Sequence, residues 1–100
     1  MTVNQNWTDN GDHDGGVSYG PGYTISWQRG PLNEAGRNGA FMIEVLESCR
    51  EQMIYYQSSK YACQENIEAL AHLERAIASL ESRRTRRANA GTLGTHQADT

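Results

Sequence analysis

The sequence predicts a mainly α protein, an antiparallel helical hairpin that follows a Gly-rich N-terminal arm. Two observations predict this class. Apolar residues recur at helical spacing between Phe41 and Leu80, while 8 of the 10 glycines and both prolines lie in the first 40 residues. We therefore expect an arm over residues 1–37, a hairpin over residues 38–90 and a Gly/Thr tail over residues 91–100.

The arm is expected to be partly disordered, because residues 1–18 are polar and rich in Asn, Asp and Gly. One segment of it differs. Residues 23–27 alternate β-branched and aromatic side chains with small polar ones and are flanked by Gly-Pro pairs. This pattern predicts a short extended segment near residues 23–29.

The spacing of apolar side chains predicts two helices. The first follows Asn38, a candidate N-cap, and carries an apolar stripe as far as Tyr56. The second follows a break at residues 58–60 and shows a strict three-four repeat from Cys63 to Arg84. Helices joined by so short a link fold back as an antiparallel pair.

The apolar content is low for a single domain. The chain has 100 residues, 37% of them hydrophobic, and a mean hydropathy of −0.74. A domain this poor in core usually needs a partner, so we expect copies of the chain to associate through the helices.

Cys49 and Cys63 fall at apolar positions of the helices and are expected to be buried free thiols. No segment approaches the roughly 18 apolar residues of a membrane span, which predicts a soluble cytosolic protein.

Charge is distributed unevenly along the chain. The net charge is −2 over residues 1–40, −4 over residues 41–82 and +3 over residues 83–100. The positive end consists of Arg83-Arg84-Thr85-Arg86-Arg87. Basic residues at a helix C-terminus complement the helix dipole, and acidic residues of the first helix are alternative partners for them across a subunit contact.

A ligand is the third explanation of the arginines, because a Gly-Thr segment follows them. Glycines in turns expose amide groups that suit phosphate, and neighbouring arginines add bidentate contacts. We therefore expect phosphate binding by a set of residues from the last helical turn and the tail: Arg83, Arg86, Arg87, Gly94 and Thr95. Arg84 continues the helical seam and is expected to serve packing or a subunit contact.

Other candidate site residues lie elsewhere. Tyr19 and Tyr23 are expected to stack on nucleobases while Arg29 meets phosphate, although these aromatic rings are equally suited to pinning the arm to the hairpin. Asn66 interrupts the apolar seam, where it either fixes the helix register or contacts a ligand. The histidines lack partners at metal spacing, so we expect no metal site, no catalytic residue and no cofactor.

Several motifs together resemble one family. The matches run in order over residues 26–96. They are Trp27-Gln28-Arg29-Gly30-Pro31, Asn38-Gly39, Tyr56-Gln57-Ser58, Tyr61-Ala62-Cys63-Gln64-Glu65-Asn66, Leu73-Glu74 and Gly91-Thr92-Leu93-Gly94-Thr95-His96. In these motifs the chain resembles the small phage nucleotide sponges that share a helical hairpin, the anti-CBASS and Thoeris anti-defence proteins.

The resemblance implies a function. Such proteins are not enzymes: they bind cyclic oligonucleotide or cyclic ADP-ribose signals of bacterial immunity in the host cytoplasm and leave them intact. The family also implies assembly into a homo-oligomer, a hexamer, with pockets between subunits. By position, Arg29 and the preceding tyrosines would meet the ligand, and the terminal arginines with the Gly-Thr tail would contact its phosphates.

Two other functions remain as alternatives from the residues. One is a helical-hairpin module that binds nucleic acid or a partner protein through the terminal arginines. The acidic pI of about 5.5 and the short basic segment argue against duplex DNA, which favours an extended positive face. The other alternative is a structural phage protein.

Overall fold

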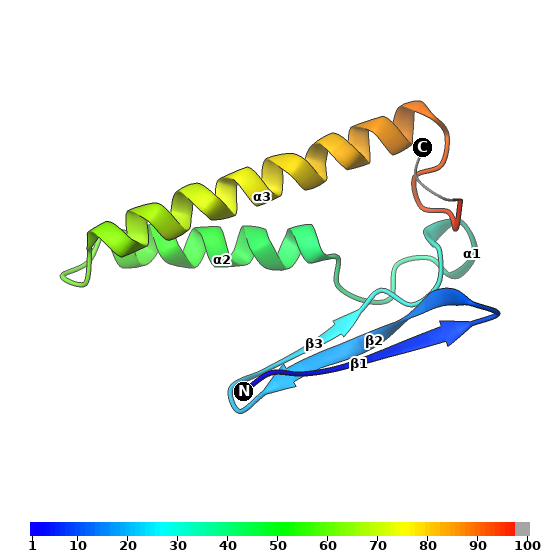
Figure 1. Cartoon of the computed structure of the whole chain (residues 1–100), viewed down its shortest axis with the longest axis horizontal. Coiled ribbons are helices and arrows are strands. Elements are labelled where there is room, and N and C mark those ends of the chain that lie inside the picture. Colours follow the sequence, from blue (N-terminus) through cyan, green and yellow to red (C-terminus); the bar gives the residue numbers. More distant parts are fainter. Residues whose placement is uncertain (98–100) are drawn as a thin grey trace. The chain divides into compact units, whose positions relative to one another are not determined.

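The computed structural model describes residues 1–97 and divides them between two compact units. The first unit holds residues 1–41 together with residues 87–97, and the second is Met42–Arg86. Within the described residues, the elements in chain order are β1 (Val3–Asp9), β2 (Asp12–Gly20), β3 (Tyr23–Trp27), α1 (Leu32–Ala35), α2 (Met42–Gln57) and α3 (Gln64–Asn89) (Figure 1).

The predicted mainly α class is wrong, because the N-terminal region is an antiparallel sheet rather than an irregular arm. Its three strands are ordered β1-β2-β3, and residues 3–27 supply all of them (Figure 1). Together with the helices this makes an α/β fold. The extended segment near residues 23–29 corresponds to β3, but β1 and β2 were not predicted.

The β1–β2 hairpin is closed by Asn10 and Gly11. Both have positive φ, 52° and 84°, which is the conformation of a type I′ turn. The twist of this turn matches the twist of paired strands, so two residues suffice to reverse the chain. The turn therefore brings residues 3–9 and 12–20 together as paired strands, although their composition alone favours loops.

An irregularity in β2 bends the sheet beside the site described below. Asn6 pairs with Gly16, but Thr8 pairs with His13, so β2 holds one more residue than β1 between these pairs. Gly15 and Gly16 have φ of 77° and 151°, and a Cβ on Gly16 would lie 2.2 Å from the carbonyl oxygen of Gln5. This is a β-bulge that requires glycine, and such bulges change the direction of neighbouring side chains.

The opposite edge of the sheet is closed by the chain that leads to α2. Trp27 and Ala40 form a parallel bridge, with the Ala40 amide donating to the Ser26 carbonyl at 2.8 Å and the Gln28 amide donating to the Ala40 carbonyl at 3.0 Å. The Trp27 indole donates to Ser18 Oγ at 2.7 Å. Trp27 thus holds two strands and the following loop together.

In the second unit, α3 runs back in the direction opposite to α2 (Figure 1). The helical periods of the sequence predicted both elements, although α2 begins at Met42 and Asn38 is not its N-cap. The α3 seam is half-buried, and Ile77 at its centre is only 3% exposed. Gln57 closes the connection between the helices: its Oε1 accepts from the Cys63 amide at 3.0 Å, and its Nε2 donates to the Cys63 carbonyl at 3.3 Å.

The cysteine prediction is wrong in one respect. Cys49 and Cys63 are both free, as expected, but both are exposed rather than buried. Cys49 lies in α2, whereas Cys63 lies in the connection just before α3 and not in a helix. Within residues 1–97, none of the helices is both long enough and apolar enough to cross a membrane.

Candidate functional site

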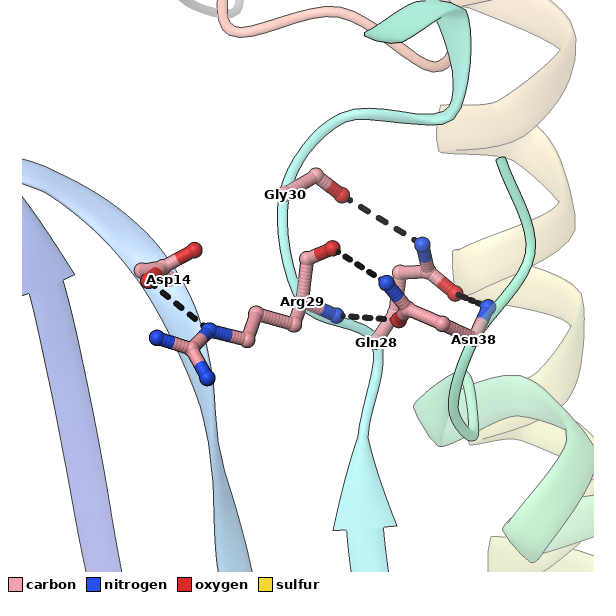
Figure 2. A network of polar contacts seen from close by, with 5 residues as sticks. All are labelled: Asp14, Gln28, Arg29, Gly30 and Asn38. Atoms are coloured by element: carbon pink, nitrogen blue, oxygen red, sulfur yellow. Dashed lines mark hydrogen bonds and ion pairs between the residues drawn. The ribbon is translucent and has the colours of Figure 1, made fainter. Parts of the chain in front are cut away.

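The loop that follows β3 is held closed by two side-chain amides. Gln28 Oε1 accepts hydrogen bonds from the amides of Asn38 and Gly39 at 2.9 and 3.2 Å, while its Nε2 donates to the Gly36 carbonyl at 2.6 Å. Asn38 makes the reciprocal pair with Arg29: its Oδ1 accepts from the Arg29 amide at 2.7 Å and its Nδ2 donates to the Arg29 carbonyl at 2.8 Å. Figure 2 shows how these bonds fix the backbone of Arg29.

The side chain of Arg29 extends from this fixed backbone toward β2 (Figure 2). Its Nε donates to Asp14 Oδ2 at 3.0 Å, and its guanidinium carbon lies 5.4 Å from the centre of the Trp7 ring. The Arg29 side chain is nevertheless 63% exposed, whereas that of Asp14 is 20% exposed. A cation is therefore held in one orientation with its outer end in solvent.

The β-bulge makes this arrangement possible. A Cβ on Gly15 would lie 3.1 Å from Arg29 Cβ and 3.3 Å from the Gln28 carbonyl oxygen, so the loop approaches β2 closely only because residue 15 is glycine. The adjacent Asp14 then faces the guanidinium. An arginine whose backbone and Nε are both fixed loses little further entropy when its outer donors bind an anion.

Replacing Asn38 by alanine tests the role of this loop. We expect the change to lower the free energy of unfolding by about 1–2 kcal/mol, because two hydrogen bonds to the Arg29 backbone are lost and each contributes roughly 0.5–1 kcal/mol net. Urea unfolding followed by tryptophan fluorescence measures the change. Asn33→Ala, at an exposed side chain of α1, is the matched control and is expected to change stability by less than about 0.5 kcal/mol. Equal losses in both variants would contradict the assigned role.

The two tyrosines predicted to stack on nucleobases point to opposite faces of the sheet. Tyr19 pairs with Thr24, and Tyr23 pairs with Gly20. Cross-strand partners share a face and consecutive residues alternate, so the Tyr19 and Tyr23 rings are separated by the sheet. The Tyr23 hydroxyl lies 2.6 Å from Thr2 Oγ1. One small ligand on one subunit therefore cannot contact both rings face-on.

The end of α3 is a Schellman motif. The Gly91 amide donates to the Ala88 carbonyl at 3.2 Å and the Thr92 amide donates to the Arg87 carbonyl at 2.9 Å, with Gly91 at φ 75°. Leu93 also donates to the Arg87 carbonyl, at 3.2 Å. The amides of Gly91, Thr92 and Leu93 are thus already used to end the helix.

Arg87 is buried at this turn, with only 4% of its surface exposed. Its Nη2 donates to the carbonyls of Thr92 and Thr95 at 2.7 and 3.2 Å. The Thr95 hydroxyl donates in turn to the Thr92 carbonyl at 2.6 Å. Arg87 therefore folds the tail back on the helix end.

The tail is also attached to other parts of the first unit. The Gly94 carbonyl accepts from the Asn33 amide at 3.1 Å, and His96 Nδ1 lies 3.2 Å from Asp12 Oδ2 at the β1–β2 turn. Ligand contacts by Gly94 and Thr95 remain a prediction, and the bonds observed for both residues are within the protein.

The remaining predicted site residues belong to the second unit. Asn66 is half-buried near the start of α3, and its Nδ2 donates to the Tyr61 carbonyl at 3.3 Å. Arg83 and Arg86 lie near the other end of the same unit. At ~1.5 Å per helical residue, Asn66 and Arg83 are roughly 25 Å apart, which is too far for one small ligand on one subunit.

Two residues of the Arg29 cluster were not predicted from the sequence. Trp7 and Asp14 lie in the segment that appeared polar and irregular. One local signal was the Asn10-Gly11 pair, which indicates a hairpin and hence the pairing of these two segments. Their convergence on Arg29 depends on the bulge, for which the adjacent Gly15-Gly16 pair is the sequence signal.

The antiparallel sheet thus presents one fixed, solvent-facing arginine beside an exposed indole. The chain is 34% identical over 74 residues, or 74% of its length, to "Thoeris anti-defense 1" of Bacillus phage SBSphiJ7. This similarity supports a relationship to phage Thoeris anti-defence proteins, one of the groups that the chain resembles in its sequence motifs. The chain spans about half (52%) of the length of that relative. No protein-family model matches it.

Proposed function

We propose that this protein counteracts Thoeris defence by binding a cyclic nucleotide immune signal in the cytoplasm of the infected bacterial host and holding it without degrading it. The relationship to a phage Thoeris anti-defence protein carries the proposal. The ligand class is a cyclic ADP-ribose or a cyclic di- or trinucleotide. Sequestration needs only tight binding, because every signal molecule that is held is withdrawn from its effector.

The geometry of Arg29 supports this function. A cyclic nucleotide carries phosphates that require fixed cationic donors, and an arginine fork matches phosphate in a bidentate manner. The Arg29 backbone is fixed by Asn38 and its Nε by Asp14, while the outer part of the side chain is in solvent. Tyr19 or Tyr23, together with Arg83 and Arg86, would supply further contacts from neighbouring copies of the chain.

The apolar surface of the second unit supports self-association. Several large side chains of α2, α3 and their connection are exposed, at 45% for Ile54, 66% for Tyr55, 68% for Tyr61 and 53% for Ile67. Ile43 and Ile77 are the only apolar side chains that are buried in the described residues. We propose that the chain forms a homo-oligomer through these helices, a hexamer, in which symmetry-related copies complete the ligand pockets.

The assembly is tested by light scattering after gel filtration. The wild-type chain is expected to elute as an oligomer, and Tyr55→Glu is expected to shift the mass to smaller species because it buries an unpaired charge in the interface. Glu51→Gln, at an exposed position of the same helix, is the control. A wild-type mass equal to one chain at every concentration would contradict self-association.

A thermal-shift screen tests the function. The panel contains cyclic ADP-ribose isomers and cyclic di- and trinucleotides, with ADP-ribose as the linear control. A ligand present at 1,000 times its dissociation constant stabilises the native state by about 4 kcal/mol, which is a shift of many degrees for a chain this small. At least one cyclic compound is expected to give such a shift. No shift with any of them would refute the proposed class of ligand.

A further inference from the structure

An exposed indole lies beside the fixed arginine and is not explained by packing alone. We propose that Trp7 and Arg29 form a two-part nucleotide site, in which Arg29 binds a phosphate and Trp7 stacks on the attached base, and that Asp14 is a positioning residue for Arg29. This inference rests on the proposed function for the class of ligand. It assigns recognition to Trp7 and Asp14, for which the sequence had suggested no role.

The phosphate half of the site follows from the bonds of the guanidinium. Asp14 accepts a hydrogen bond from Nε at 3.0 Å. Within residues 1–97, neither Nη group donates a hydrogen bond to the protein. The two Nη groups form the edge of the guanidinium that lies opposite Nε. Each Nη group still carries donors for an anion. Because the side chain is 63% exposed, a phosphate reaches these donors without displacing Asp14.

The base half of the site follows from the surroundings of Trp7. Its side chain is 44% exposed, and the other residues of β1 are Val3, two asparagines, a glutamine, a threonine and an aspartate. A tryptophan in so polar an edge strand contributes little to a core. The Arg29 guanidinium carbon lies over one face of this ring, 5.4 Å from its centre, so a base stacked on the other face of the indole and a phosphate on the guanidinium would be close enough to belong to one nucleotide.

The role of Asp14 is positional, since its negative charge by itself opposes an anion. The bulge at Gly15 and Gly16 turns its carboxylate toward Nε, and the side chain is largely shielded at 20% exposure. A neutral hydrogen-bond acceptor of the same shape would hold Nε equally well. Asp14→Asn should therefore keep or strengthen binding, whereas Asp14→Ala should weaken it.

A simpler role for Trp7 is to shield the Arg29–Asp14 ion pair. The two roles differ in their dependence on the base. A shielding indole affects the affinity for every phosphate equally, whereas a stacking indole affects only ligands that carry a base. Stacking on an aromatic ring contributes a factor of roughly 5 to 150 in affinity per base.

The experiment is calorimetric titration of the full chain with three probes: cyclic ADP-ribose, adenosine 5′-monophosphate and ribose 5-phosphate. Trp7→Leu is expected to weaken binding of both nucleotides by at least fivefold and to leave that of ribose 5-phosphate unchanged. Trp7→Phe is expected to restore most of the affinity. Gln5→Leu, on the same strand, is the matched control with wild-type affinity. Circular dichroism and thermal melting confirm that each variant is folded.

Fluorescence provides a second measurement on the same samples. A base stacked on Trp7 is expected to quench tryptophan emission in the wild type, and Trp7→Phe, which keeps only Trp27, is expected to lose this quenching. Retained quenching in Trp7→Phe, or an unchanged nucleotide affinity in Trp7→Leu, would overturn the role of Trp7. Equal affinities in Asp14→Asn and Asp14→Ala would overturn the role of Asp14.

The outcomes also separate this inference from the proposed function. Binding of cyclic ADP-ribose that is insensitive to Trp7 would leave the function standing and reject the two-part site. Trp7-dependent binding of adenosine 5′-monophosphate without binding of any cyclic nucleotide would support the site and reject the function. Absence of binding for all three probes would reject the site.

Discussion

Replacing Arg87 by alanine is expected to lower the free energy of unfolding by about 3 kcal/mol. Arg87 is 4% exposed, and its Nη2 donates to the carbonyls of Thr92 and Thr95. The Thr92 carbonyl keeps the Thr95 hydroxyl and amide as donors, but the loss of the Arg87 bond to the Thr95 carbonyl costs about 1–3 kcal/mol, and the lost side chain adds a cavity. The same change releases the tail from the helix end, so its contacts with Asn33 and Asp12 should weaken as well.

Two variants control for the charge and for the position in the helix. Arg87→Lys keeps the charge but lacks the planar fork, so we expect it to recover less than half of the loss. Arg84→Ala, at an exposed position of the same turn, is expected to change stability by less than about 0.5 kcal/mol. Urea unfolding is followed by tryptophan fluorescence, since Trp7 and Trp27 both report on the first unit. Equal stabilities of Arg84→Ala and Arg87→Ala would show that Arg87 does not hold the tail.

Replacing Arg29 by alanine is expected to weaken binding of the cyclic nucleotide at least 100-fold. A charge-assisted, bidentate contact with phosphate accounts for roughly 3 kcal/mol of binding free energy. Because Asn38 fixes the backbone of Arg29, little of this free energy is lost in ordering the residue. Because Arg29 is 63% exposed, the loss of its ion pair with Asp14 should cost no more than about 1 kcal/mol of stability.

Titration calorimetry of Arg29→Ala, Arg29→Lys and the wild type measures this effect. We expect Arg29→Lys to retain part of the affinity, since the ammonium keeps the charge but not the fork. Arg75→Ala, at an exposed position in the middle of α3, is the control for a general loss of positive charge. Equal affinities of Arg29→Ala and Arg75→Ala would place the ligand elsewhere on the protein.

The sequence predicted the helices better than the sheet for a physical reason. The repeat of α3 reflects burial of one face, and the structure confirms that face with Leu70, Leu73, Ile77 and Leu80 half-buried or buried. Strands β1 and β2 carry few apolar side chains, so their sequences lack the alternation by which strands are recognised. Their pairing depends on a turn of two residues, Asn10 and Gly11, and on glycines that permit close approach of neighbouring backbones.

The candidate site was predictable only in part. Arg29 was chosen because it follows aromatic residues, and the structure shows it fixed and exposed. Asp14 and Trp7 lie at the β-bulge, and the bulge brings them to Arg29. The bulge changes the strand register, which composition does not reveal. The sequence assigned Arg87 to the ligand and Arg84 to packing or a subunit contact, but the observed burial is the reverse: Arg87 is enclosed by the tail, whereas Arg84 is exposed.

The central claim is that the protein binds a cyclic nucleotide signal and leaves it intact. The most direct measurement is titration of the wild-type chain with cyclic ADP-ribose isomers and cyclic di- and trinucleotides, followed by heat denaturation and chromatography of the released nucleotide. The account predicts saturable binding of at least one of them and recovery of that compound, unchanged, in the amount that was bound. Recovery of a hydrolysed product, or no binding by any of them, would contradict it.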